Sequence, residues 1–371
     1  MKLKLSLFIF LALSVLGCTN LEEELREDLT GDQARALLEG SSEAEVDALL
    51  LSAYRGLRAP FQSQTGFWAT QELTADGAIP PTRGGDWDDN GKWRALHLQN
   101  VDGDHPDQSA TFNDLLKIVF STTNILNFGP TASQAAQARF LRAWAIFCVA
   151  DGWNQVPFRE PGEDLLQAPR VLQGAEAIDF VIDELTAIGG DLPDGPATRA
   201  NKDAAKALLM KCYLNRGTFA DRSNPSFPAG DMTQVISLAD ELIGSGKYAL
   251  ADNYFDNFSA NNTQISPELI WVEENLGGSN SGDVHTRWFM TMHYNQNPSG
   301  WNGFATLSDF YDKFDPADSR FGGEYDGVTD VLGVRSGFLF GQQYDVKGNE
   351  LEDRRGNKLA FTKEVSLIEV A

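Results

Sequence analysis

The chain has 371 residues, of which 42% are hydrophobic, and this is enough apolar material for a sizeable core in one large or two modest domains. Its formal net charge of −23 argues against a nucleic-acid partner, because binding to a phosphate backbone needs a basic surface. Beyond the N-terminal region, no apolar run reaches the length that a membrane-spanning helix needs.

The N-terminal region has the pattern of an exported lipoprotein. Two lysines precede an apolar run from Leu5 to Leu16, which is too short to span a bilayer and suits the core of a signal peptide. A glycine and Cys18 follow, and this junction resembles a bacterial lipobox, in which the cysteine is acylated and becomes the first residue after cleavage. We therefore expect residues 1–17 to be a lipoprotein signal peptide, Cys18 to be lipidated, and residues 18–30 to form an acidic tether. An ordinary secretory signal with a chance cysteine is the alternative.

Six later segments have the apolar period of an α-helix. In one of them Ile178 and Ile182 lie on the same apolar stripe. Gly152 and Gly217 are expected to end two other helices, and Asp231 is the expected N-cap of the last. The expected helices cover about residues 42–57, 112–126, 137–152, 175–190, 201–217 and 231–246.

Successive helices with small-residue contact faces predict a mostly α fold of tetratricopeptide-like helical hairpins. Residues 59–111 and 247–371 are rich in Gly, Asn, Asp, Pro and aromatic residues, so we expect the second part of the protein to be loop-rich and partly irregular. Within it, only stretches such as Leu269–Glu273 and Gly337–Val346 have the composition of strands.

The standard catalytic and cofactor signatures are absent from the sequence. It contains no HExxH, no GxSxG, no Walker loop and no dinucleotide-binding fingerprint, and its four histidines lack metal-ligand spacing. Cys148 and Cys212 lie within expected helices, so buried free thiols are the favoured interpretation, with a disulfide left open. These observations favour a protein that is not an enzyme.

Four stretches resemble a known family. Residues 137–158 contain an Arg-Phe-Leu-Arg-Ala helix followed by a glycine-containing turn into Val-Pro, and residues 202–216 are similar to the next repeat helix. Residues 239–271 contain Ser-Gly-Lys-Tyr and Ser-Pro-Glu-Leu-Ile-Trp, and residues 300–321 contain Gly-Trp and Asp-Pro. In this order they resemble the SusD/RagB family, whose members are surface lipoproteins that bind glycans for TonB-dependent uptake.

The resemblance implies that residues 31–371 form one SusD-like domain, with a helical-repeat scaffold and ligand-binding loops. It also implies a non-catalytic protein, lipid-anchored in the outer membrane and exposed at the cell surface, that delivers oligosaccharide to a SusC-like TonB-dependent transporter. The family continues past the last residue of this sequence with another repeat helix, so we expect the last repeat to be missing here. Residues 59–130 match the family least.

Two aromatic-rich stretches, residues 83–100 and 285–301, have the composition of a carbohydrate site. Flat aromatic rings stack on the apolar C–H faces of sugars, and Asn, Asp and Arg side chains bind the hydroxyls. Because Trp87 and Trp93 are flanked by glycines and charges, we expect both to be exposed, whereas Trp301 suits a core position as well as a ligand contact. The expected ligand-binding residues are Trp87, Asp88, Asn90, Trp93, Arg94, Trp288, Tyr294, Asn295 and Trp301.

Residues 86–91, DWDDNG, match the start of an EF-hand, with Asp86, Asp88 and Asn90 as the first calcium ligands. The twelfth position of this loop is His97 rather than the glutamate that such a site needs. A plain acidic turn is therefore the favoured interpretation, with calcium as the alternative and no other cofactor expected.

Two other functions remain open. One is a surface glycosidase, which needs a proton-donating carboxyl and a charged carboxylate at a fixed separation. The other is a helical-repeat scaffold that binds only proteins. Arg139 and Arg142 are expected to form an ion-paired helix face rather than an anion site. The candidate carboxylates of a glycosidase are Asp86, Asp88, Asp89, Glu273 and Glu274.

Overall fold

The structure is a computed structural model. It describes residues 40–75, 77–82, 86–259, 261–277, 282–291, 300–315, 317–318 and 349–350, together with the strand residues 328–329, 335–336, 341–342, 360–361 and 365–367. The chain divides into two units, Met1–Gly40 and Ser41–Ala371, and the described helices and strands belong to the second. The predicted signal peptide, Cys18 and the tether lie outside the described residues. No described helix combines the length and apolarity needed to cross a membrane.

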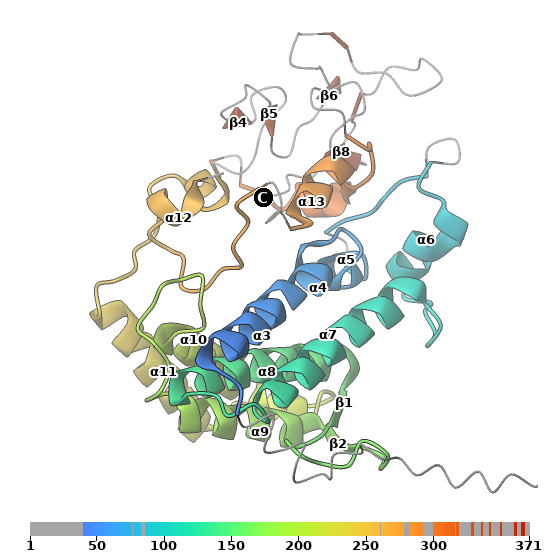
Figure 1. Cartoon of the computed structure of the whole chain (residues 1–371). Coiled ribbons are helices and arrows are strands. Elements are labelled where there is room, and N and C mark those ends of the chain that lie inside the picture. Colours follow the sequence, from blue (N-terminus) through green and yellow to red (C-terminus); the bar gives the residue numbers. More distant parts are fainter. Residues whose placement is uncertain are drawn as a thin grey trace, which may run out of the picture. The chain divides into compact units, whose positions relative to one another are not determined.

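The scaffold consists of helices that pack on their neighbours in chain order. α7 packs on α8, α8 on α9, α9 on α10 and α10 on α11, while α3 lies across α7 and α8 (Figure 1). This arrangement confirms the prediction of a mostly α, tetratricopeptide-like fold. The helices are α3 (Glu43–Gly56), α4 (Arg58–Gln62), α5 (Phe67–Glu72), α6 (Lys92–His97), α7 (Pro106–Ile125), α8 (Ala132–Trp153), α9 (Gly174–Ile188), α10 (Lys202–Ala220) and α11 (Ala229–Gly244).

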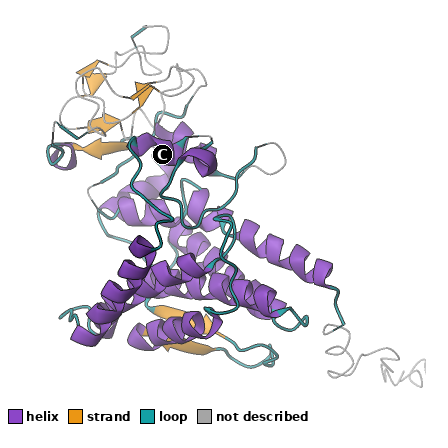
Figure 2. Cartoon of the chain, turned by 90° about the vertical axis from the view of Figure 1, so that its left-hand side faces the viewer, coloured by secondary structure: helices purple, strands orange, loops and turns teal. Residues whose placement is uncertain are grey.

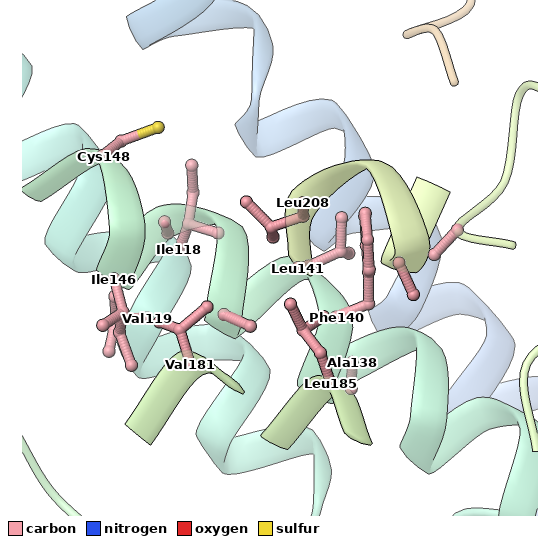
Figure 3. Close-up of a cluster of buried hydrophobic side chains, with 14 of the residues drawn as sticks. Ile118, Val119, Ala138, Phe140, Leu141, Ile146, Cys148, Val181, Leu185 and Leu208 are labelled. Atoms are coloured by element: carbon pink, nitrogen blue, oxygen red, sulfur yellow. The ribbon is translucent and has the colours of Figure 1, made fainter. Parts of the chain in front are cut away.

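Helix α8 lies at the centre of the main core because it is apolar on nearly every side. It begins with a capping box, in which the Thr131 hydroxyl accepts from the backbone N–H of Gln134 and the Gln134 side chain accepts from that of Thr131. Buried alanines such as Ala138 let neighbouring helices approach closely, and Phe140 and Leu141 fill the spaces between them. Figure 3 shows these side chains meeting others from α7, α9 and α10 in one interior.

Several predicted helix ends are wrong. Helix α8 continues through Gly152 and ends at Asn154, which adopts a left-handed conformation. Gly217 lies inside α10. A glycine is required there because a Cβ at this position would lie 2.0 Å from the carbonyl oxygen of Ser226. Asp231 does not cap α11, which begins two residues earlier; it is buried and forms an ion pair with Arg216 instead.

A two-stranded antiparallel hairpin between α8 and α9 was not expected. Strand β1 (Gln155–Phe158) pairs with β2 (Arg170–Gln173), and the hairpin lies against the helices (Figure 2). A four-residue strand with Val156 and Phe158 buried gives too short an alternation for a sequence-based prediction. The hairpin matters below because its connecting loop forms one wall of a cavity.

The remaining described elements are short. The expected strand at Leu269–Glu273 does not form; Val272 only donates one backbone hydrogen bond to Ala197. Of Gly337–Val346, two residues form strand β6, and the others lie outside the described residues. The elements are η1 (Asp89–Gly91), η2 (Tyr254–Phe258), α12 (Asn262–Ile265), α13 (Val284–Thr291), β3 (Ala305–Leu307), α14 (Ser308–Tyr311), β4 (Val328–Thr329), β5 (Arg335–Ser336), β6 (Gly341–Gln342), β7 (Ala360–Phe361) and β8 (Val365–Leu367).

Cys148 and Cys212 are buried free thiols, as the favoured interpretation predicted. Burial raises the pKa of both thiols well above its ordinary value, so neither forms the reactive thiolate at neutral pH. We expect iodoacetamide to leave both unmodified in the folded protein and to alkylate both in concentrated denaturant. Mass spectrometry of the two tryptic peptides measures this directly, and rapid modification under native conditions would contradict the burial.

Candidate functional site

A cluster of aromatic rings, here called the tryptophan cluster, lies where the two aromatic-rich stretches meet. Its members are Trp68, Trp87, Trp93 and Phe304, and the ring of Phe304 lies 5.2 to 5.7 Å from the other three, measured between centroids. Edge-to-face and offset stacked pairs at this separation are favourable beyond the area that they bury. The cluster therefore fixes the positions of the loops that carry these residues.

The prediction that Trp93 is exposed is wrong, because only 3% of this residue is accessible. Its indole N–H donates to the Asp89 carboxylate over 2.6 Å, and the Lys92 ammonium covers its ring at 4.1 Å. The charged residues next to Trp93 therefore form a hydrogen bond and a cation–π contact with a buried ring, and they do not indicate that the ring is exposed. Trp93 supports the site from within and offers no ring face to a ligand.

Trp87 is half-buried and connects the two loops. Its indole N–H donates to the backbone carbonyl of Trp301 over 2.9 Å. Its ring also lies against Gly303, where a Cβ would come within 2.3 Å of ring carbon Cζ2. A second connection comes from Ile79 and Ala305, which exchange two backbone hydrogen bonds of 2.8 Å. The two aromatic-rich stretches therefore meet at Trp87 and Trp301.

The exposed part of this region combines an aromatic face with polar side chains. Trp301 is 41% exposed, and its ring lies 5.7 Å from that of Phe289 in α13. From the other loop, Asp88 and Arg94 form an exposed ion pair over 3.2 Å, and Asn90 is also exposed. The Trp87–Trp301 hydrogen bond joins the loop with these polar groups to the segment with the exposed Trp301. An apolar ring and hydrogen-bonding groups are what a neutral, hydroxylated ligand needs, without any catalytic group.

The turn that carries the polar groups has an unusual backbone. Three of its non-glycine residues have positive φ angles: 62° at Trp87, 41° at Asp89 and 56° at Asn90. Such conformations are rare, above all for a bulky residue, and persist only where surrounding contacts enforce them. Here the tryptophan cluster and the Asp89–Trp93 hydrogen bond enforce the turn. Backbone strain of this kind is concentrated at functional sites.

The EF-hand arrangement does not form. Residues 92–97, which would supply its second half, are the helix α6, so they cannot wrap around an ion with Asp86 and Asn90. The Asp88 carboxylate is engaged by Arg94. Within the part of the chain that the structure describes, no cluster of three or more His, Cys, Asp or Glu side chains could hold a metal ion. The DWDDNG stretch is an acidic turn that leads into a helix.

Two arginines join α13 and its neighbourhood to the scaffold. Arg287 donates to the backbone carbonyl of Phe61 and lies 5.6 Å over the ring of Trp68. Burial lowers the pKa of its guanidinium to about 10. Arg58 forms an ion pair with Glu273 over 2.8 Å, and burial nevertheless raises the pKa of this carboxyl above its ordinary value. Both arginines hold the segments on either side of the site in place.

Some predicted site residues cannot be placed. Tyr294 and Asn295 lie outside the described residues, and Trp288 lies in α13 with its side chain outside the description. Conversely, the sequence did not point to Phe289 or to His285, which lies 5.7 Å from it in an edge-to-face contact. The helical spacing of these two residues, four apart, would have placed them on one face of α13 had the helix been predicted.

Solved structures of known proteins share this fold. A laminarin-binding SusD-like protein superimposes with a TM-score of 0.61 at 21% sequence identity, over 76% of this chain and 65% of its own. Surface glycan-binding protein A from Bacteroides thetaiotaomicron, solved with laminarihexaose, gives 0.60 at 14% identity over 76% and 63%. A SusD-like carbohydrate-binding protein from Bacteroides fragilis gives 0.60 at 19% identity over 84% and 62%.

This chain thus spans somewhat less than two thirds of the length of each of these three structures. No protein-family model and no curated protein matches the sequence. At these identities the likeness concerns the fold, which agrees with the helical scaffold and the order of its elements described above. The chain has the SusD-like fold.

Proposed function

We propose that this protein is a non-catalytic glycan-binding lipoprotein of the cell surface, which delivers oligosaccharide to a TonB-dependent outer membrane transporter. The observation that carries the proposal is an exposed Trp301, which is hydrogen-bonded through its backbone carbonyl to the loop that carries Asp88, Asn90 and Arg94. The structural neighbours of the scaffold include proteins described as laminarin-binding and glycan-binding. A shared fold does not determine function, so the chemistry of the site has to support the proposed ligand.

The chemistry of this site suits a neutral sugar chain. The Trp301 ring provides a flat apolar surface for the C–H face of a pyranose, and its 41% exposure leaves that surface accessible. Asp88 accepts hydrogen bonds from hydroxyls, Arg94 donates to them, and Asn90 does both. The net charge of −23 makes a neutral ligand more favourable than an acidic one.

The anchor and the partner follow from the N-terminal sequence and from the family resemblance. Acylation of Cys18 would attach two or more chains, and stable membrane anchoring needs at least two such signals. Residues 18–30 would then act as a tether. Delivery to a SusC-like transporter rests on the resemblance, and co-purification of the two proteins from solubilised outer membranes tests it.

Replacing Trp301 with alanine is expected to weaken glycan binding roughly tenfold or more, because the ring is the main exposed apolar contact of the site. Folding should be little affected, since Trp301 belongs to neither buried core and the Trp87 N–H donates to a backbone carbonyl that the variant retains. Affinity electrophoresis in gels that contain single polysaccharides, laminarin among them, measures the change.

Phe258→Ala is the matched control. The exposed fraction of Phe258, 43%, is similar to that of Trp301. Phe258 belongs to η2, and its aromatic contact is with Tyr254 rather than with the tryptophan cluster. We expect it to migrate as the wild type does in every gel. Equal retardation of wild type and Trp301→Ala by a polysaccharide that binds would remove Trp301 from the site.

A further inference from the structure

A cavity of about 330 Å³ lies between helix α7 and the loop that connects strands β1 and β2. It is separate from the tryptophan cluster, since none of the residues that line it belongs to that cluster or to the loops around it. Its volume is at the lower end of the range for small-molecule sites, roughly 300 to 1,000 Å³. It can therefore hold a small ligand, of about one or two sugar rings.

One wall of the cavity is a face of α7 with the composition of a carbohydrate site. Phe120 and Asn124 are four residues apart, which places them on one side of α7, and Asn127 follows in the turn after the helix. The Phe120 ring is 53% exposed, an unusual state for a phenylalanine. The Asn127 amide donates to the Asn124 carbonyl over 3.3 Å, so the two amides act as one polar group.

A threonine that lines the cavity carries a buried hydroxyl that no group in the described part of the chain satisfies. Thr123 lines the cavity, is 7% exposed, and its Oγ1 has no hydrogen-bond partner. The neighbouring Thr122, by contrast, donates to the Ile118 carbonyl one turn earlier. A buried polar atom without a partner is unfavourable, and such atoms are few in folded proteins. Rotation of the Thr123 side chain about χ1 would turn this buried hydroxyl toward a ligand that lies beside Phe120 in the cavity.

The opposite wall is held in place by an arginine. Arg159 donates hydrogen bonds to the backbone carbonyls of Asp164, Leu165 and Gln167. These hydrogen bonds fix the conformation of the loop. Glu160 is paired with Arg170 over 3.0 Å. The Glu163 carboxylate has no ion-pair partner among the described residues, and it lies at the cavity, where it can accept hydrogen bonds from a ligand.

We propose that this cavity is a second carbohydrate site, which takes a neutral mono- or disaccharide with one ring face stacked on Phe120 and its hydroxyls bound by Thr123, Asn124, Asn127 and Glu163. The Glu163 carboxylate and the two amides suit the hydroxyls of a neutral sugar. The choice of a sugar as the ligand rests on the proposed function. The cavity, the unpartnered Thr123 hydroxyl and the exposed Phe120 ring are features of the structure and do not depend on that function. A short sugar in this site would bind independently of the glycan at Trp301.

The test is calorimetric titration of the full chain with cellobiose, laminaribiose, maltose and diacetylchitobiose. At least one is expected to bind saturably, and Phe120→Ala should weaken it roughly tenfold while Phe120→Trp, which keeps a flat ring, should not. Thr123→Val should weaken the same sugar roughly threefold to tenfold. It should also raise the midpoint of denaturation, because it removes a buried hydroxyl that lacks a partner in the free protein.

Two controls separate this site from the one at Trp301. Phe227→Ala removes a phenylalanine of similar exposure, 59%, that does not line the cavity, and should leave disaccharide affinity unchanged. Trp301→Ala should also leave it unchanged, even if that variant has lost binding to long polysaccharides. Equal affinity in wild type and Phe120→Ala, or no binding of any of the four disaccharides to the folded wild type, would overturn the second site. Unchanged polysaccharide binding in Trp301→Ala would overturn only the role of Trp301.

Discussion

Replacement of Gly303 by alanine is expected to weaken glycan binding strongly while the scaffold still folds. A Cβ at this position would lie 2.3 Å from Cζ2 of Trp87 and 2.7 Å from the carbonyl oxygen of Met290. The backbone of Met290 cannot yield, because Gly303 and Phe304 both donate hydrogen bonds to that same carbonyl. Trp87 must therefore move, and its hydrogen bond to the carbonyl of Trp301 is lost.

The expected cost in stability is about 1 to 3 kcal/mol, the usual range for overpacking a filled interior. The expected loss of affinity for a polysaccharide that binds the wild type is roughly tenfold or more, since the exposed ring loses its support. Urea denaturation and affinity electrophoresis on the same preparation measure the two effects. Gly190→Ala is the control, because a Cβ there meets nothing within 4 Å. A Gly303→Ala variant with wild-type affinity would show that Trp87 does not position Trp301.

The largest stability effect is expected at Glu184. Its carboxylate accepts hydrogen bonds from Arg139, over 2.7 Å, and from Arg142. Arg142 is 2% exposed, and two of its guanidinium nitrogens have no hydrogen-bond partner among the residues that the structure describes. Glu184→Gln would leave this buried cation without a counter-charge, which costs about 3 to 5 kcal/mol. Asp114→Asn, which breaks the exposed pair with Lys117, should cost less than about 1 kcal/mol.

The same pair predicts a pH dependence. Burial alone would raise the pKa of Glu184, but the hydrogen bond from Arg139 and the charge of Arg142 outweigh it and lower that pKa below the ordinary 4.5. A carboxyl with a lowered pKa stabilises the folded state above its unfolded pKa and loses this effect as the pH falls through the folded value. The difference in unfolding free energy between wild type and Glu184→Gln should therefore be constant above about pH 6 and shrink below pH 4.5. A difference that does not change with pH would contradict the ion pair.

The sequence predicts the helical scaffold well, because each long helix has a regular apolar period. Helix α3, with Ser42 as its cap and Glu45 completing a capping box, begins where expected. Helix ends were less predictable. Gly152 and Gly217 lie inside helices, and the reason for glycine at the second position is the backbone of Ser226, which the sequence of α10 cannot reveal.

The candidate site was predicted in composition but not in detail. A tryptophan among aspartates and a lysine looks exposed in sequence, yet Asp89 and Lys92 are the groups that satisfy and cover Trp93 in the interior. The contact between Trp87 and Trp301 spans 214 positions of sequence, so no local pattern could specify it. Short segments such as β1 depend on tertiary contacts for their conformation, which is why the hairpin was missed.

The measurement that tests the central claim most directly is a titration of the purified chain with a panel of neutral polysaccharides, in which tryptophan fluorescence and reducing ends are followed in the same samples. The account predicts saturable binding of at least one polysaccharide, no release of reducing ends during prolonged incubation, and loss of that binding in Trp301→Ala. Steady release of reducing ends would identify a glycosidase instead. Binding of none of the panel by a folded chain would contradict a glycan-binding function.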